Sequence, residues 1–232
     1  MLDRPAGYPV MRFEGLIGAR ILKRINRFAV QIDVEGRTEL AHLHDPGRLL
    51  EIVYPGNEVL VRRTDGPKLK WRIEFGKING RYVLIDSGLH SDIARRFLPE
   101  GAVPEVRVGR KRIDFRYGDD YIEVKGCTLM ANGIAMFPDA PTKRGLEHLK
   151  TLETLASSGY RSHVMMIITR DDVRCFYPNF ETDPKFAEAF LRLVPAYVKA
   201  HFLTFGFDGL YLRYAGSIGL CADVGHGTNG RL

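Results

Sequence analysis

The stretch KRIDFRYGDDYIEVKG, residues 111–126, decides the fold of the second half of the chain. Two runs of alternating apolar and polar residues flank a Gly-Asp-Asp turn, which is typical of a β-hairpin. Side chains two apart in a strand share a face, so Glu123 and Lys125 are expected side by side. Antiparallel pairing across the turn would bring Asp114 towards Glu123. The stretch therefore predicts two carboxylates and an ammonium group gathered on adjacent strands.

Two interpretations fit this arrangement. One is a surface ion pair, which contributes less than about 1 kcal/mol to stability. The other is an active site, and the neighbouring residues favour it, because Ile113, Phe115, Ile122 and Val124 alternate with the charged positions and predict a buried opposite face. The charged side chains would then stand on strands that are anchored in a core.

Two converging carboxylates repel each other unless a positive charge lies between them. Oxygen ligands of this kind suit magnesium or manganese, so we expect Asp114 and Glu123 to be metal ligands. A bound metal would lower the pKa of a water molecule, which Lys125 could orient or deprotonate. Glu105, one predicted strand earlier, is a third acidic candidate, and a plain surface glutamate is the alternative there.

The clearest helix pattern is TKRGLEHLKTLETLASSG, residues 142–159, with leucines at helical spacing and a glycine stop. Amide groups at its start, with Lys143 and Arg144 beside them, could hold a phosphate. His148 lies four residues after Arg144 and therefore on the same helix face. It is a candidate for substrate contact, or else a surface histidine beside Glu147.

Residues 13–83 instead show five or six short alternating runs separated by turns such as Asp45-Pro46-Gly47 and Asn79-Gly80. So many strands in about 70 residues predict a small Greek-key barrel like the OB-fold. Its basic segment around Trp71 could stack on a base and contact phosphates, although Trp71 could equally fill the barrel core. The candidate nucleic-acid contacts in this part are Arg48, Lys68, Lys70, Trp71 and Arg72.

Charge and composition limit the partners. Residues 1–82 hold 15 Lys and Arg against 10 Asp and Glu, whereas residues 83–232 hold 19 against 18, which favours a polyanion partner for the first part. We expect no membrane span, because no apolar run of about 18 residues occurs, and the first residues do not resemble a secretory signal. The three cysteines lie far apart, which predicts neither a disulfide framework nor a thiolate zinc site and fits a reducing cytoplasm.

Two segments together, KRIDFRYGDDYIEVKGCTL and FPDAPTKRGLEHLKTL, closely resemble the SfsA (sugar fermentation stimulation protein A) family. HLHDPGRLL and YPNFETDPKFAEAF resemble further segments of that family, so the likeness spans about residues 12–214. The resemblance implies an OB-like N-terminal domain, a PD-(D/E)xK nuclease-type C-terminal domain, DNA binding and metal-dependent nuclease chemistry.

By this resemblance, Asp114 matches the metal-binding aspartate, Glu123 and Lys125 match the ExK pair, and Glu105 looks like the upstream acid. The motif that opens the long helix is matched by Asp139, Thr142, Arg144 and His148. The sequence departs from the family pattern at Lys111, at Gly126-Cys127 and at Asp45-Pro46, none of which replaces the three central residues. These departures bear on substrate and cleavage rate more than on the site itself.

The sequence thus predicts an α/β protein with an OB-like barrel (1–82), a restriction-endonuclease-like mixed-sheet domain (83–214) and a glycine-rich tail (215–232). We interpret it as a magnesium- or manganese-dependent nuclease, with DNA a better candidate than RNA. A non-catalytic DNA-binding regulator of sugar-utilisation genes is the main alternative, and an RNA-processing factor is a weaker one. The sequence leaves the oligomeric state open, with a homodimer as one candidate.

Overall fold

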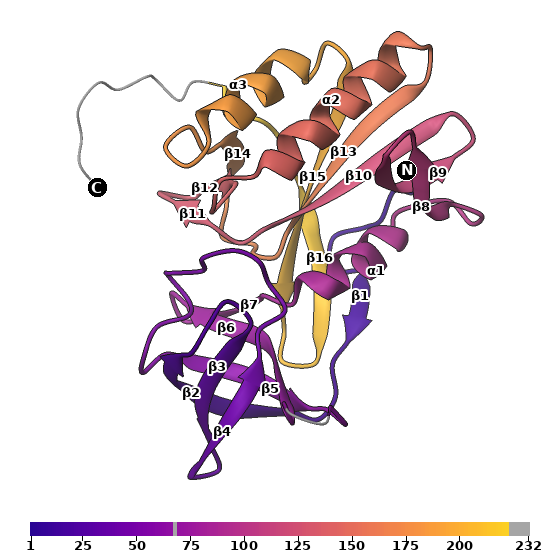
Figure 1. Ribbon diagram of the computed structural model, residues 1–232. Helices are drawn as coiled ribbons and strands as arrows, with labels where there is room; N and C mark the ends of the chain where they lie inside the picture. The colour runs from indigo at the N-terminus through magenta and orange to yellow at the C-terminus, as the bar shows by residue number, and fades with distance from the viewer. Residues whose placement is uncertain (67–68, 223–232) are drawn as a thin grey trace.

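The computed structural model describes residues 1–66 and 69–222 and shows a β-barrel packed against a larger α/β unit (Figure 1). The barrel strands pair in the order β4-β3-β2-β5-β6-β7, and an additional β4–β6 pairing closes five of them into a ring. This arrangement confirms the predicted OB-like barrel. Its strands are β2 (Leu16–Arg24), β3 (Ala29–Val34), β4 (Arg37–His42), β5 (Glu58–Arg63), β6 (Trp71–Ile78) and β7 (Arg81–Leu84).

Alternating burial along the barrel strands produces its core, as the period of two requires. Val30 and Ile32 of β3 are fully buried, and so are Val59 and Val61 of β5. Trp71 belongs to this same core and is only 7% exposed. The interpretation of Trp71 as a base-stacking residue is therefore wrong, because its ring fills the barrel and is not presented to a ligand.

The larger unit is built on a seven-stranded mixed sheet with the order β1-β16-β15-β13-β10-β9-β8. The central pairings β10–β13 and β13–β15 are parallel, and the outer ones are antiparallel. A smaller sheet has the order β11-β12-β14. The strands of these two sheets are β1 (Pro9–Arg12), β8 (Val103–Val108), β9 (Lys111–Tyr117), β10 (Asp120–Cys127), β11 (Met130–Ala131), β12 (Ile134–Phe137), β13 (Arg161–Ile168), β14 (Cys175–Pro178), β15 (Val198–Phe207) and β16 (Tyr211–Ile218).

The first and last strands of the described residues pair with each other in this sheet, which the predicted domain limits did not include. β1 precedes the barrel in sequence, yet it pairs with β16 of the larger unit. Its Val10 packs in the core of that unit. The segment predicted as a glycine-rich tail begins as ordered strand, since β16 continues to Ile218, and the rest of that prediction, residues 223–232, lies outside the described residues.

Helices cover both faces of the seven-stranded sheet. On one face lie α2 (Lys143–Ser157) and α3 (Pro184–Leu193), whose leucines and phenylalanines pack on the strands. On the other face lies α1 (His90–Arg95), which follows the short 3-10 turn η1 (Ser87–Leu89). None of the helices in the described part of the chain combines the length and apolar character needed to cross a bilayer.

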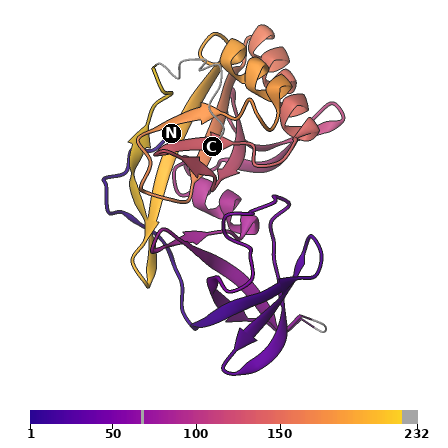
Figure 2. The ribbon, with the colours of Figure 1, turned by 90° about the vertical axis from the view of Figure 1, so that its left-hand side faces the viewer.

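The barrel and the α/β unit share a continuous core. Phe13, Phe75 and Phe207 form an aromatic cluster at the junction, with the rings of Phe75 and Phe207 stacked 4.1 Å apart. The Thr169 hydroxyl donates a hydrogen bond of 2.8 Å to the carbonyl of Leu84. Figure 2 shows the β15–β16 hairpin in yellow, reaching from the helices to the barrel. These contacts join the barrel directly to the larger sheet.

A disulfide joins Cys175 to Cys221, which the wide sequence spacing of the three cysteines did not predict. The residues are 46 positions apart in sequence, but the segment after β16 runs beside β14. The Phe176 amide donates to Gly219 O at 2.9 Å, and the Cys221 amide donates to Phe176 O at 3.0 Å. The two cysteines are thus close in space although they are far apart in sequence. Cys127 is a free, buried thiol.

Candidate active site

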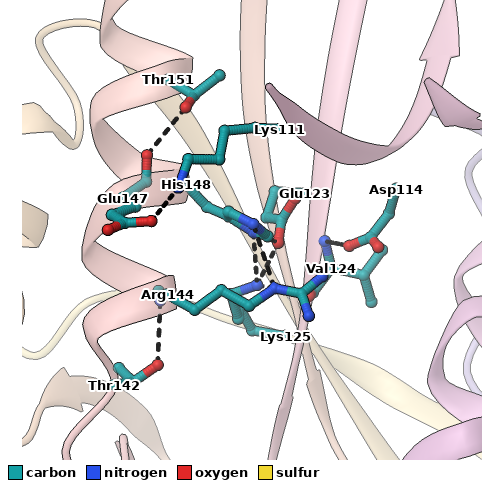
Figure 3. A network of polar contacts seen from close by, with 11 residues as sticks. Lys111, Asp114, Glu123, Val124, Lys125, Thr142, Arg144, Glu147, His148 and Thr151 are labelled. Atoms are coloured by element: carbon teal, nitrogen blue, oxygen red, sulfur yellow. Dashed lines mark hydrogen bonds and ion pairs between the residues drawn. The ribbon is translucent and has the colours of Figure 1, made fainter. Parts of the chain in front are cut away.

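Glu123 and Lys125 share one face of β10, as the alternation predicted (Figure 3). The Lys125 ammonium donates a hydrogen bond to Glu123 Oε1 and a second, of 3.2 Å, to the Val124 carbonyl. Glu123 is 2% exposed, and the Lys125 side chain is 17% exposed. The pair is therefore not a solvated surface contact but a largely buried one that faces α2.

Asp114 sits where the β9–β10 ladder breaks. The register runs from Asp120 opposite Tyr117 to Ile122 opposite Phe115 and ends there. The Asp114 Oδ2 atom then accepts a hydrogen bond of 2.6 Å from the Val124 amide, in place of a backbone carbonyl. This substitution turns the Asp114 carboxylate towards β10, next to the Glu123–Lys125 pair (Figure 3).

The pKa values of the two carboxyl groups shift in opposite directions. Burial and the negative charge of Glu123 raise the pKa of Asp114 to about 6, against the opposing effect of Lys125. Burial would also raise the pKa of Glu123, but the charge of Lys125 and the hydrogen bond from His148 outweigh it and hold that pKa below its usual value. Glu123 thus carries its charge at neutral pH, and Asp114 is an anion that the site disfavours.

One oxygen of Glu123 is left without a partner. Its Oε2 atom is buried and accepts no hydrogen bond, although Oε1 accepts two. A buried carboxylate oxygen of this kind is costly unless a ligand satisfies it. Together with the destabilised anion of Asp114, it fits a hard divalent cation placed between the two carboxylates.

Helix α2 supplies the other side of the site. It begins after Thr142, whose hydroxyl accepts from the Gly145 amide at 3.1 Å as an N-cap, while the Thr142 amide donates to Asp183 at 2.8 Å. His148, two turns on, is 4% exposed and donates to Glu123 Oε1 through Nδ1. Arg144 Nε lies 3.4 Å from His148 Nε2. His148 is thus part of the carboxylate cluster and not a surface residue, since Glu147 pairs with Lys111 instead.

A cleft of about 250 Å³ opens beside these residues, between the barrel and the α/β unit. Val124, Lys125 and Gly126 form one wall, and the segment from Phe137 to Gly145 forms another. The barrel contributes Arg27 and the loop Asp45-Pro46-Gly47. The cleft therefore joins the barrel and the start of α2 at Lys125, while Asp114 and Glu123 lie behind Lys125 and are not part of its lining.

The barrel loop was identified from sequence as a turn, and its place over the site was missed. Gly47 abuts Asp139 so closely that a Cβ at residue 47 would overlap that carboxylate, and Asp139 Oδ2 accepts from the Leu49 amide at 3.4 Å. Burial raises the pKa of Asp45 to about 7, and the charge of Asp139 adds to this effect, against the Gly47 hydrogen bond. Asp139 thus ties the loop before α2 to the barrel, a contact that neither the Asp-Pro-Gly turn nor the helix-opening motif containing Asp139 predicted.

Other predicted residues lie apart from this cluster. Glu105, on the edge strand β8, does not join the carboxylates: its side chain is 60% exposed and lies 3.5 Å from Arg112. Arg72 of the barrel lies 3.3 Å from Asp86, and about a third of its side chain (35%) remains exposed. Of the remaining candidates, Arg48, Lys70 and Lys143 are exposed, and Lys68 lies outside the described residues.

Two further observations concern where a substrate or a metal ion could bind. A larger hollow of about 510 Å³ lies between β7 and the β15–β16 hairpin, but none of Asp114, Glu123 and Lys125 lines it. Within residues 1–66 and 69–222, no three or more His, Cys, Asp or Glu side chains gather in a way that could hold a metal ion. Two carboxylates are sufficient for magnesium, which commonly keeps several waters and binds substrate phosphate oxygens as well.

Comparison with known proteins gives concordant matches. Residues 22–85 match the family model described as the SfsA N-terminal OB domain, and residues 84–209 match the sugar fermentation stimulation protein RE domain. A sugar fermentation stimulation protein homolog of Thermoplasma volcanium is 49% identical over 208 residues, covering 90% of this chain and 96% of the relative. A homolog from Saccharolobus solfataricus is 46% identical over 216 residues, covering 93% and 90%. The structure of Pyrococcus furiosus SfsA in complex with Ca²⁺ superposes with a TM-score of 0.83 at 28% identity, covering 91% of this chain and 98% of that one.

Proposed function

The chain belongs to the sugar fermentation stimulation protein (SfsA) family, and from this premise we propose that it is a metal-dependent nuclease. It would hydrolyse a phosphodiester bond of a nucleic acid that is held between the barrel and the α/β unit. The observation that carries the proposal is the carboxylate pair. Glu123 keeps one buried oxygen unpaired, beside the destabilised anion of Asp114 and on the same face as Lys125.

Asp114 and Glu123 would hold Mg²⁺ or Mn²⁺. Such an ion, when bound, acts as a Lewis acid that lowers the pKa of water and offsets charge on a scissile phosphate. The complex of Pyrococcus furiosus SfsA with Ca²⁺, another oxygen-preferring cation, supports this choice of metal class. The ligand chemistry also supports it, because hard divalent ions prefer carboxylate oxygens to nitrogen or sulfur.

The protein's own groups would divide the remaining work. Lys125, which lines the cleft, would stabilise negative charge that develops on the phosphate or move a proton from the attacking water. His148 holds Glu123 in position from α2. Arg144 and the N-terminal amides of α2 would receive the substrate phosphate, and Arg27 extends the positive lining onto the barrel.

The test is cleavage of labelled single- and double-stranded DNA and RNA in Mg²⁺, Mn²⁺ or EDTA. Wild type is compared with Lys125→Ala and with Lys150→Ala, a control that removes an exposed lysine from α2. We expect cleavage that requires metal, is lost in Lys125→Ala and is unchanged in Lys150→Ala, with all three proteins binding the polymer.

The opposite outcome is also informative. Salt-sensitive binding of nucleic acid without cleavage in either metal, equal in wild type and Lys125→Ala, would overturn the proposal. It would favour a non-catalytic DNA-binding regulator that keeps the carboxylate pair as scaffold. The preferred polymer in the cleavage assay would separate a DNA nuclease from an RNA-processing enzyme.

A further inference from the structure

A row of three aromatic side chains lies at the surface of the barrel, and we call Phe28, His42 and His44 the ring row. Phe28 directly precedes β3, His42 ends β4, and His44 follows two residues later. Alternation along this segment buries Ala41 and Leu43 in the barrel core, so the two histidines point outward. Ring centroids lie 6.4 Å apart between Phe28 and His42 and 5.4 Å apart between His42 and His44.

The exposure of Phe28 sets it apart from the other phenylalanines. All 13 of them lie within the residues that the structure describes, and Phe28 alone is exposed, with 45% of its surface accessible. A single exposed apolar side chain needs no explanation, but a contiguous row of rings is characteristic of a surface that binds a partner.

Hydrogen bonds hold the rings of the row in place. The Phe28 carbonyl accepts from the Leu43 amide at 3.0 Å and lies 3.1 Å from His42 Nδ1. His44 Nδ1 lies 2.9 Å from Oδ1 of the fully buried Asp86. Burial and the neighbouring His44 hold the pKa of His42 below its usual value, so its ring is neutral at pH 7. Rings that are fixed in this way lose little side-chain freedom when a ligand binds.

Arginine side chains accompany the ring row. The Arg27 guanidinium lies over the Phe28 ring, 5.5 Å from its centroid, and donates to the Pro46 carbonyl at 2.9 and 3.1 Å. Arg72 is the partner of His42 in the β4–β6 ladder, and 35% of its side chain is exposed. Rings for bases and cations for phosphates are the two components of a surface that binds single-stranded nucleic acid.

The ring row also lies at the rim of the cleft that Lys125 lines. Arg27 is part of the cleft lining, and so is Ser87, whose amide and hydroxyl both donate to the His44 carbonyl. A strand that is bound along the row would therefore continue into the cleft.

We propose that Phe28, His42 and His44 stack on the bases of single-stranded nucleic acid and lead that strand into the cleft. A duplex hides the faces of its bases in its own stack, so only unpaired bases can meet the rings. Stacking tolerates any sequence, because every base has a π-face. The inference rests on the proposed nuclease function and narrows its substrate to a single strand that is bound without strong sequence preference.

The experiment measures binding of a labelled mixed-sequence strand of about 20 nucleotides, longer than the roughly 4–16 that one OB-fold covers. Fluorescence anisotropy is recorded in EDTA, so that cleavage does not enter, and the same strand annealed to its complement is the duplex probe. Phe28→Ala should weaken single-strand binding by about 5–150-fold, the loss expected for one stacked base, and change duplex binding less than about two-fold. Phe28→Tyr, which restores a ring, should bind the single strand within about two-fold of wild type.

Salt dependence separates stacking from charge. Phe28→Ala should leave the slope of log affinity against log salt unchanged, whereas Arg27→Ala should reduce it by about 0.7, the value for one phosphate of a single strand. Tyr197→Ala is the matched control. Tyr197 is 50% exposed, but it precedes β15 at the end of the sheet remote from Lys125, so its loss should alter neither affinity nor slope.

The proposal is overturned if Phe28→Ala binds the single strand as tightly as wild type, or if it loses as much affinity for the duplex. Unchanged binding would assign the row to a protein partner instead. These outcomes are independent of cleavage. Weaker single-strand binding by Phe28→Ala, with a wild type that cleaves nothing, would support the row and overturn the nuclease, and the reverse result would overturn the row alone.

Discussion

His148 and Glu123 are joined by a hydrogen bond that is buried at both ends, with 4% of the histidine and 2% of the glutamate exposed. This bond ties α2 to β10, so the helix sets the position of the Glu123 carboxylate. It also leaves Glu123 Oε1 shared between His148 and Lys125, and Oε2 free for a ligand. A nuclease built on this site should depend on His148 through Glu123.

We therefore predict that His148→Ala lowers cleavage at least about 10-fold and shifts its pH dependence. The hydrogen bond from His148 holds the pKa of Glu123 down, so its loss raises that pKa. Because a protonated Glu123 cannot hold the metal, the acidic limb of the pH–rate profile should move to higher pH. Thr151→Ala, on the same helix, is the control, and superimposable profiles for wild type and His148→Ala would refute the role.

Asp114→Asn should abolish cleavage and yet stabilise the metal-free protein. The pKa of Asp114 is raised to about 6 in the folded state, so folding favours its protonated form and stability falls as pH rises from about 4 to about 6. Each pKa unit corresponds to about 1.4 kcal/mol, so removing the charge should increase the free energy of unfolding by about 1–3 kcal/mol at pH 7.5. The gain should vanish at pH 4.

Urea unfolding with and without Mn²⁺ at the two pH values checks this prediction. Added Mn²⁺ should stabilise wild type, because it binds the folded state, and should have little effect on Asp114→Asn. A variant that is less stable than wild type at pH 7.5 without metal would show that the Asp114 charge is satisfied by the protein alone.

Gly126→Ala should disturb the strand that carries Lys125. A Cβ at residue 126 would overlap the imidazole of His90, which is packed under β10 with its Nε2 unpaired. Overpacking of this kind typically costs about 1–3 kcal/mol and shifts the backbone. We expect a matching loss of stability together with reduced cleavage, since Lys125 is the adjacent residue.

The double variant Gly126→Ala/His90→Ala tests the cause. Removing the imidazole makes room for the new methyl group, so the two substitutions should be less harmful together than the sum of their separate effects. Purely additive losses of unfolding free energy would mean that the overlap with the His90 imidazole is not the reason why Gly126→Ala destabilises the protein. Gly118→Ala is not a suitable comparison, because its positive φ adds backbone strain; Gly18→Ala, with open space around it, is the matched control.

The sequence predicted the parts of this site that depend on residues close together in the chain, and it did not predict the parts that depend on distant contacts. Alternation along a strand is local, so it placed Glu123 and Lys125 on one face, and a single hairpin brought Asp114 to them. Whether Trp71 faces the barrel core or a ligand depends on closure by the β4–β6 pairing, which no local pattern encodes. The prediction that Glu105 contributes a third carboxylate to the site also depended on the assembled sheet. Glu105 lies on an edge strand, where its exposed side chain is near Arg112 instead.

The contact between the barrel and the loop before α2, and the disulfide, join residues still further apart in sequence and were likewise not predicted. The strand pattern predicted an OB-like barrel, but the contact of Gly47 with Asp139, which brings the barrel loop over the site, joins residues about 90 positions apart. The Cys175–Cys221 bond depends on the path of the chain after β16. Such contacts emerge only when the whole sheet is assembled.

The Cys175–Cys221 disulfide leads to a prediction about stability. Cross-linking residues 46 apart restricts the unfolded chain, which for loops of this size contributes about 2–4 kcal/mol. Wild type in reductant, and Cys175→Ser without reductant, should therefore both unfold about 5–15 °C below the oxidised protein. Reductant should not lower the melting temperature of Cys175→Ser further, because the variant has lost the disulfide and its remaining cysteines are Cys221 and the buried Cys127. Equal melting temperatures of oxidised and reduced wild type, with thiol titration confirming reduction, would show that the bond closes a segment already held by β14 and β16.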